Sequence, residues 1–165
     1  PQQAAAEAEA LVKAAPQDPY FLELEGQILL ESGKPAEALK ALRTATERTN
    51  YQPLIATTFG HALIATEDKA NYAEAVKVLR VAVNRDDENP FAWYQLGIIY
   101  DREGDAPRAA LATAERYSLE NNPRLALTSA DMALHGLPEG TPDWLRAQDI
   151  AMVSRTAVQD QRKKR

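Results

Sequence analysis

Cysteine is absent from the 165-residue chain, and histidine occurs only twice, at His61 and His135. Without cysteine the chain forms no disulfide and performs no thiol chemistry, which suits either a reducing cytosol or a periplasm. No H-E-x-x-H sequence and no glycine-rich phosphate loop is present. The sequence therefore predicts no cofactor, no metal site and no catalytic residue, and we expect this chain by itself not to be an enzyme.

Long apolar runs are missing too, since no stretch approaches the roughly 20 residues that cross a bilayer. Apolar residues nevertheless make up 45% of the chain, enough for a folded core. Lys and Arg number 19 against 24 acids, and four of these bases form the terminus Arg162–Arg165. We interpret that terminus as a solvated end, with a cloning remnant or an electrostatic tag as alternatives. The acidic body argues against a nucleic-acid partner, and we expect no membrane span.

A helical repeat is what the sequence does contain. The segment Asn89–Asp105 reads NPFAWYQLGIIYDREGD, in which an asparagine N-cap and a proline begin a helix and Gly104 ends it. Apolar residues recur at the i, i+3, i+4, i+7 spacing of one helical face: Trp93, Leu96, Gly97 and Tyr100. This W-x-x-L-G-x-x-Y pattern resembles the first half of a tetratricopeptide repeat (TPR), a helix–turn–helix unit of about 34 residues.

Further copies of the unit are spaced along the chain. The interior glycine recurs, at intervals of 34 and 37 residues, at Gly26, Gly60 and Gly97. The partner-helix alanines Ala38 and Ala75 are also 37 residues apart, so the three extra residues lie in the loop Thr66–Asn71. No alternating strand pattern competes. The sequence predicts an all-α fold, a TPR-type antiparallel helix-pair solenoid of about eight helices in a single domain.

Proline and glycine divide residues 1–165 into six segments. These are a half-repeat helix at 2–15, repeats at 19–50, 53–87 and 90–120, a partial repeat at 123–138, and a capping helix at 141–160. We expect the helix that starts near Pro107 to be the partner of one repeat and the leader of the next. We expect the last helix to have an apolar inner face and a polar outer face. The half-repeat indicates a piece of a longer polypeptide.

A binding surface is implied by the resemblance, because the leading helices of TPR proteins line a concave groove. Register with the three glycines gives the groove positions Tyr20, Glu23, Gln27, Leu54, Thr57, His61, Ile64, Phe91, Tyr94, Ile98, Asp101 and Arg102. Their mixture of aromatic, aliphatic and hydrogen-bonding groups is expected of a surface that binds a protein or peptide segment. The alternative is that several of them pack against a neighbouring domain or helix.

One class of peptide ligand is disfavoured by the same register. TPR proteins that clamp a C-terminal carboxylate carry Lys, Asn and Arg at these positions. Here Glu23, Gln27, Thr57 and Tyr94 stand instead. We therefore expect a free EEVD-like peptide to bind weakly or not at all, which calorimetric titration would test.

Three segments carry a narrower resemblance: PYFLELEGQILLESGKPAEALKALR, FAWYQLGIIYDREGD followed by ALATAE, and GTPDWLRAQDI. Over about residues 19–150 the chain resembles the C-terminal TPR region of bacterial BepA-type periplasmic zinc metallopeptidases. The resemblance implies a periplasmic, non-catalytic module whose partners are a peptidase domain of the same polypeptide and outer-membrane assembly proteins. The alternatives are a free-standing TPR scaffold of another complex and a cytoplasmic location.

Overall fold

The computed structural model describes residues 2–163, and every regular element in that range is helical. Nine α-helices and one 3₁₀ helix (η1) follow one another: α1 Gln2–Ala14, α2 Pro19–Glu31, α3 Pro35–Arg48, α4 Pro53–Ala65, η1 Lys69–Asn71, α5 Tyr72–Arg85, α6 Pro90–Arg102, α7 Ala106–Leu119, α8 Pro123–Gly136 and α9 Pro142–Lys163. The all-α prediction is confirmed, with one more α-helix than expected. No helix in the described range is both long and apolar enough to cross a membrane.

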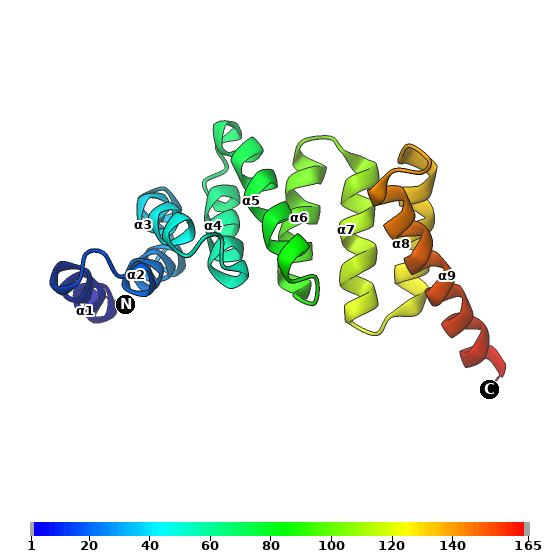
Figure 1. The fold of residues 1–165 in the computed structure, drawn as a ribbon, viewed down its shortest axis with the longest axis horizontal. Helices are drawn as coiled ribbons and strands as arrows, with labels where there is room; N and C mark the ends of the chain where they lie inside the picture. The colour runs from blue at the N-terminus through cyan, green and yellow to red at the C-terminus, as the bar shows by residue number, and fades with distance from the viewer. Residues whose placement is uncertain (1, 164–165) are drawn as a thin grey trace. The chain divides into compact units, whose positions relative to one another are not determined.

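The chain divides into two compact units, whose helices are labelled in Figure 1. Unit 1 extends to Asp86 and holds α1 to α5, and unit 2 starts at Asp87 and holds α6 to α9. The assignment of the whole chain to a single TPR domain stays a prediction. A division of this kind follows from repeat architecture, because each helix of a repeat array packs mainly against its neighbours in sequence.

Local cap chemistry fixes where the helices begin. The Asn89 side chain accepts hydrogen bonds from the backbone N–H groups of Phe91 at 3.0 Å and Ala92 at 3.3 Å, and Pro90 occupies the first turn of α6. Asp18 accepts from the N–H of Tyr20 at 2.9 Å at the start of α2. These bonds satisfy N–H groups that have no partner within the helix. The helix starts predicted at Asp18-Pro19 and Asn89-Pro90 are confirmed.

In unit 1 the helices pack as successive neighbours. α1 packs on α2, α2 on α3, α3 on α4 and α4 on α5, and α2 also reaches α4. Leu42, Phe59, Leu63 and Leu79 are fully buried there. Each is a large apolar side chain whose burial stabilises the fold by roughly 1.5–3 kcal/mol. Helix α4 thus has neighbours on more than one side, which limits how much of it reaches solvent.

The three-residue insertion in unit 1 is absorbed by a local structure. The loop after α4 forms η1, where Asp68 accepts a hydrogen bond from the N–H of Ala70 at 2.9 Å. The Asn71 side-chain amide donates to the Thr66 hydroxyl at 2.8 Å. These contacts close the longer loop on itself, so the pairing of α4 with α5 is kept.

In unit 2 helix α7 has the most neighbours, since it packs against α6, α8 and α9. The prediction that this helix serves two repeats is therefore confirmed. Ion pairs join α7 to α9: Arg108 pairs with Asp143 at 2.9 Å, and Arg146 pairs with Glu115. The start of α9 carries the expected N-cap, because the Thr141 hydroxyl accepts from the N–H of Trp144 at 3.3 Å.

The last helix, α9, has a buried inner face and an outer face of mixed polarity. Its inner face is buried as expected, at Ala147, Ile150, Ala151 and Val158. Its outer face exposes three large apolar side chains, Leu145, Met152 and Val153. Most other exposed positions of α9 are polar or charged, Gln148, Asp149, Arg155 and Asp160 among them, so the outer face is mixed.

Candidate functional site

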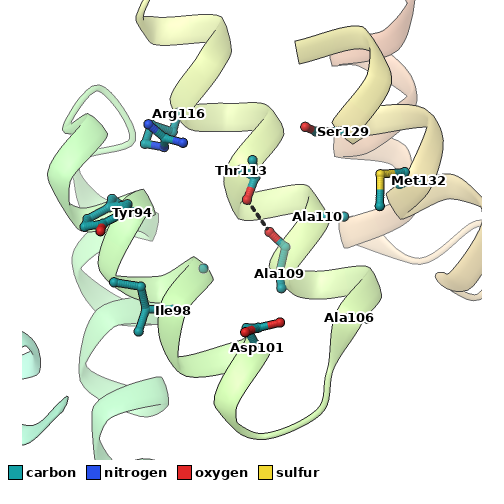
Figure 2. A pocket seen from close by; sticks show the side chains of 11 residues that line it. Tyr94, Ile98, Asp101, Ala106, Ala109, Ala110, Thr113, Arg116, Ser129 and Met132 are labelled. Atoms are coloured by element: carbon teal, nitrogen blue, oxygen red, sulfur yellow. Dashed lines mark hydrogen bonds between the residues drawn. The ribbon is translucent and has the colours of Figure 1, made fainter. Parts of the chain in front are cut away.

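A pocket of about 390 Å³ opens in unit 2 over helix α7 (Figure 2). We call it the α7 pocket. Helices α6, α7 and α8 supply its lining, which consists of Tyr94, Gly97, Ile98, Asp101, Ala106, Ala109, Ala110, Thr113, Arg116, Ser129 and Met132. Small and apolar residues dominate, with a few polar groups at defined places. A pocket of this size and composition is suited to a ligand group of modest size.

The pocket exists because one large side chain is replaced by a small one. In unit 1 a Cβ on Gly26 would lie 2.4 Å from Cγ of Leu42, and one on Gly60 would lie 2.5 Å from Cγ of Leu79. The corresponding residue of α7 is Thr113, 34 residues after Leu79.

A Cβ on Gly97 would meet nothing closer than 3.7 Å, and the Thr113 Oγ1 is one of the atoms at that distance. Leucine fills the space beside the glycine in the first two repeats. Threonine leaves it open in the third.

Substitution by alanine should therefore change the stability of the fold differently at Gly60 and at Gly97. We expect Gly60→Ala to lower the free energy of unfolding by about 1–2 kcal/mol, because overpacking against Leu79 outweighs the gain in helix propensity. Gly97→Ala should leave it unchanged or raise it by up to about 1 kcal/mol. Urea denaturation followed by circular dichroism measures both. Equal destabilisation by the two variants would contradict this account of the pocket.

Polar groups of the pocket lie at its two ends and on its floor. On the floor, the Thr113 hydroxyl donates to the carbonyl of Ala109 at 2.9 Å, so the threonine presents no unsatisfied donor (Figure 2). Asp101 is exposed near the turn from α6 to α7. Arg116 lies at the other end, with its guanidinium 5.5 Å from the ring centre of Tyr94 and 4.4 Å from that of Tyr117. It also pairs with Glu120 at 3.2 Å.

Three of the twelve sequence-predicted groove residues, Tyr94, Ile98 and Asp101, line this pocket together. They follow one another at i, i+4 and i+7 on α6 and so share one face. Phe91 and Arg102 are exposed on the same helix but are not part of the lining.

In unit 1 the predicted residues differ in their exposure. Tyr20 and Leu54 are 63% and 60% exposed. Gln27 is exposed and donates to Glu31 at 3.1 Å. Glu23 and His61 are half-buried. Burial raises the pKa of the Glu23 carboxyl and lowers the pKa of the His61 imidazole, because it disfavours the charged form of each.

Two of the predicted groove residues, Thr57 and Ile64, are buried, so neither presents an exposed side chain to a partner, and their assignment to the groove stays a prediction. They lie two turns apart on one face of α4, and the Thr57 hydroxyl donates to the carbonyl of Pro53 at 2.8 Å. α4 packs against both α3 and α5, which leaves little of its surface exposed. Alignment to the repeat predicts which face of the helix carries a side chain. It does not predict how many other helices pack on that face.

Eight lining residues were absent from the predicted groove set: Gly97 on α6, which the sequence assigned to helix packing, and seven residues on α7 and α8. The seven on α7 and α8 are Ala106, Ala109, Ala110, Thr113, Arg116, Ser129 and Met132. The prediction took groove residues from the leading helices of three repeats only. The sequence nevertheless contained a sign of the pocket. When the partner helices are aligned, Thr113 occupies the position that Leu42 and Leu79 occupy in the other two repeats.

Metal ligation has no support in the described part of the chain. Within residues 2–163 no group of three or more His, Asp or Glu side chains is arranged to hold a metal ion. The α7 pocket itself contains a single carboxylate, that of Asp101, and no histidine. Its arrangement suits contact with an apolar side chain and one charged group.

The chain is a helical-repeat protein. Its helices pack as successive pairs, and a glycine recurs at the same position of the first helix in three of them. The tetratricopeptide repeat family model matches residues 1–53 and 65–126, and the chain belongs to this family. No curated protein matches the chain.

Several solved structures share the fold. Two crystal structures of MamA are each 21% identical to the chain. One covers 96% of this chain and 89% of its own with a TM-score of 0.66, and the other covers 92% and 81% with a TM-score of 0.67. The thermophilic TPR protein TTC0263 of Thermus thermophilus is 22% identical, covers 90% of this chain and 89% of its own, and has a TM-score of 0.53. At such identities the likeness concerns the fold.

Proposed function

We propose that the chain is a protein–protein interaction module that binds a peptide segment of a partner protein in the α7 pocket. The observation that carries this proposal is the space beside Gly97, which leucine fills in the two preceding repeats. Membership of the TPR family is consistent with a scaffold that binds proteins. A concave pocket with a few polar groups at its edge is a common form of anchor site for a partner side chain.

The exposure of the walls supports the same function. Tyr94 on α6 and Met132 on α8 stand on opposite sides of the pocket and are both exposed (Figure 2). Aromatic and methionine side chains are enriched in protein interfaces, where they cover apolar ligand groups at modest conformational cost. Together they would enclose an inserted side chain above Gly97.

Filling the pocket tests the function directly. Thr113→Leu places in α7 the residue that packs on glycine in the other two repeats. We expect it to keep or raise stability while it weakens peptide binding by about tenfold or more, equivalent to about 1.4 kcal/mol. The probe is a phage-displayed random dodecapeptide library selected on the wild-type chain. Affinities of enriched, fluorescein-labelled peptides are then measured by fluorescence anisotropy.

Thr44→Leu provides the matched control. Thr44 lies on α3 in unit 1, and its hydroxyl donates to the carbonyl of Lys40 at 3.0 Å, the same type of bond that Thr113 makes. Peptides enriched on the wild type should bind this variant normally. A library that yields no binder, or binders that tolerate Thr113→Leu as well as Thr44→Leu, would exclude the α7 pocket as the binding site.

The three segments that resemble BepA-type peptidases support a more specific function for the chain. The chain would then be the TPR region of a periplasmic zinc peptidase that acts in outer-membrane protein assembly or quality control. Its partners would be the peptidase domain of the same polypeptide and outer-membrane assembly proteins. The alternative is an adaptor that holds another complex together.

Reading the encoding gene separates these two functions. An upstream H-E-x-x-H sequence preceded by a secretory signal would favour the peptidase and a periplasmic location. A gene without either would favour the adaptor. Neither result affects the test of the pocket, because the Thr113→Leu measurement uses only the purified chain.

A further inference from the structure

The two ends of the α7 pocket differ in charge. Asp101 is exposed at one end, and no ion pair or side-chain hydrogen bond to it is found in the described part of the chain. The adjoining turn adds Glu103 and Asp105, and Asp105 shares Arg108 with Asp143 at 2.8 and 2.9 Å. With Arg102 included, this end holds four acids and two bases, which leaves a net charge of −2.

The opposite end is already neutralised. Arg116 is stacked on the rings of Tyr94 and Tyr117, and its guanidinium pairs with Glu120. Stacking and ion pairing hold the guanidinium in place and balance its charge. The pocket therefore offers an anionic ligand no free cation, whereas Asp101 offers a cationic ligand a free carboxylate.

The apolar part of the pocket lies one helical turn from that carboxylate. Ile98 precedes Asp101 by three residues on α6, so their Cβ atoms are about 5–6 Å apart. An extended peptide places side chains i and i+2 on the same face, about 6.5–7 Å apart. One side chain can therefore enter the space beside Gly97 while the side chain two positions away reaches Asp101.

We propose that the α7 pocket selects a basic, apolar peptide segment, in which a leucine-sized side chain fills the space beside Gly97 and a Lys or Arg two residues away pairs with Asp101. This inference rests on the proposed function and specifies its ligand class. The acidic character of the chain outside its last four residues favours the same class of partner, because complementary charge accelerates encounter.

The test uses the peptides selected from the phage-displayed dodecapeptide library. We expect the enriched sequences to share a large apolar residue with Lys or Arg two positions away. For one such labelled peptide, Asp101→Asn should weaken binding about three- to fivefold, the size expected of an exposed ion pair. Asp101→Lys should reverse the preference, so that the same peptide with Glu in place of its basic residue binds better than the original.

Asp149→Asn is the control, because Asp149 is an exposed acid of unit 2 on α9, a helix that supplies none of the pocket's lining. It should change affinity less than twofold. Peptides that lose affinity on Thr113→Leu yet lack a basic residue, or that bind Asp101→Asn and Asp101→Lys unchanged, would overturn this inference and leave the proposed function standing. The absence of any peptide sensitive to Thr113→Leu would overturn both.

Discussion

Replacing Trp93 by alanine should lower the free energy of unfolding by about 3–5 kcal/mol, the range for large-to-small changes at buried aromatic positions. Trp93 is only 4% exposed in unit 2. Its indole Nε1–H donates to the carbonyl of Asp87 at 2.8 Å, and the guanidinium of Arg146 lies 4.9 Å from the centre of its ring. Alanine would leave a cavity, an acceptor without its donor and an arginine without its stacking partner.

The neighbouring Tyr94 is the matched control for this prediction. Tyr94 is exposed on the same helix and lines the α7 pocket. Tyr94→Ala should change the free energy of unfolding by less than about 1 kcal/mol, as an exposed position with one cation–π contact allows. It should instead weaken peptide binding. Urea denaturation followed by far-ultraviolet circular dichroism gives both stabilities. Comparable destabilisation by the two variants would contradict the assignment of the buried and exposed faces of α6.

The second large effect is expected for Arg146→Ala, which should cost about 3 kcal/mol at pH 7 because it leaves a buried carboxylate without its partner. The side chain of Glu115 on α7 is only 11% exposed, and its carboxylate forms an ion pair with Arg146 on α9. Arg146 also pairs with Asp87 at 3.0 Å. The substitution thus removes a link between α9, α7 and the segment that precedes α6.

The cost of Arg146→Ala should depend on pH. Burial raises the pKa of the Glu115 carboxyl, while its bond with Arg146 acts in the opposite direction. Without Arg146 that pKa rises further. A group whose pKa is raised on folding stabilises the fold below its unfolded pKa, about 4.3 for Glu, and loses this contribution as pH rises through its folded pKa. The difference in unfolding free energy between wild type and variant should therefore be large at pH 7 and narrow towards pH 4.

Measuring unfolding free energies from pH 4 to pH 8 checks this expectation. Glu115→Gln in the Arg146→Ala background is the control, because it removes the charge that would be left unpaired. That double variant should be more stable than Arg146→Ala alone at pH 7 and should have lost the added pH dependence. A gap that stays constant across this range would mean that Arg146 stabilises the fold through packing on Trp93 and not through Glu115.

The helices and their starts could be predicted because they depend on residues close in sequence. Asn89 and Asp18 lie directly before prolines, and a cap followed by proline begins a helix whatever surrounds it. The double role of α7 could also be predicted, since the alanine spacing of the following segment already indicated a partner on its other side. Capping residues and the spacing of apolar residues along a helix are therefore enough to predict where the helices begin and which of their faces pack.

The binding surface was predicted only in part, because exposure depends on the number of neighbouring helices. On α6 the predicted Tyr94, Ile98 and Asp101 come together in the α7 pocket. On α4 the equivalent register gives Thr57 and Ile64, which are buried, and that helix packs against α2, α3 and α5. The pocket itself depends on a difference between copies, Thr113 against Leu42 and Leu79, and no single repeat contains that difference.

The exchange of leucine for threonine beside a recurring glycine has a consequence for protein engineering. A repeat array presents the same scaffold several times, so a feature that distinguishes one copy can be transplanted to another. Leu79→Thr would recreate beside Gly60 the vacancy now found beside Gly97. Its cost in unfolding free energy would be about 2–4 kcal/mol, as for other buried leucine truncations. A designer could then decide for each repeat whether leucine fills the space beside its glycine or threonine leaves it open. The chain would serve as a scaffold for designed receptors with one or several side-chain pockets.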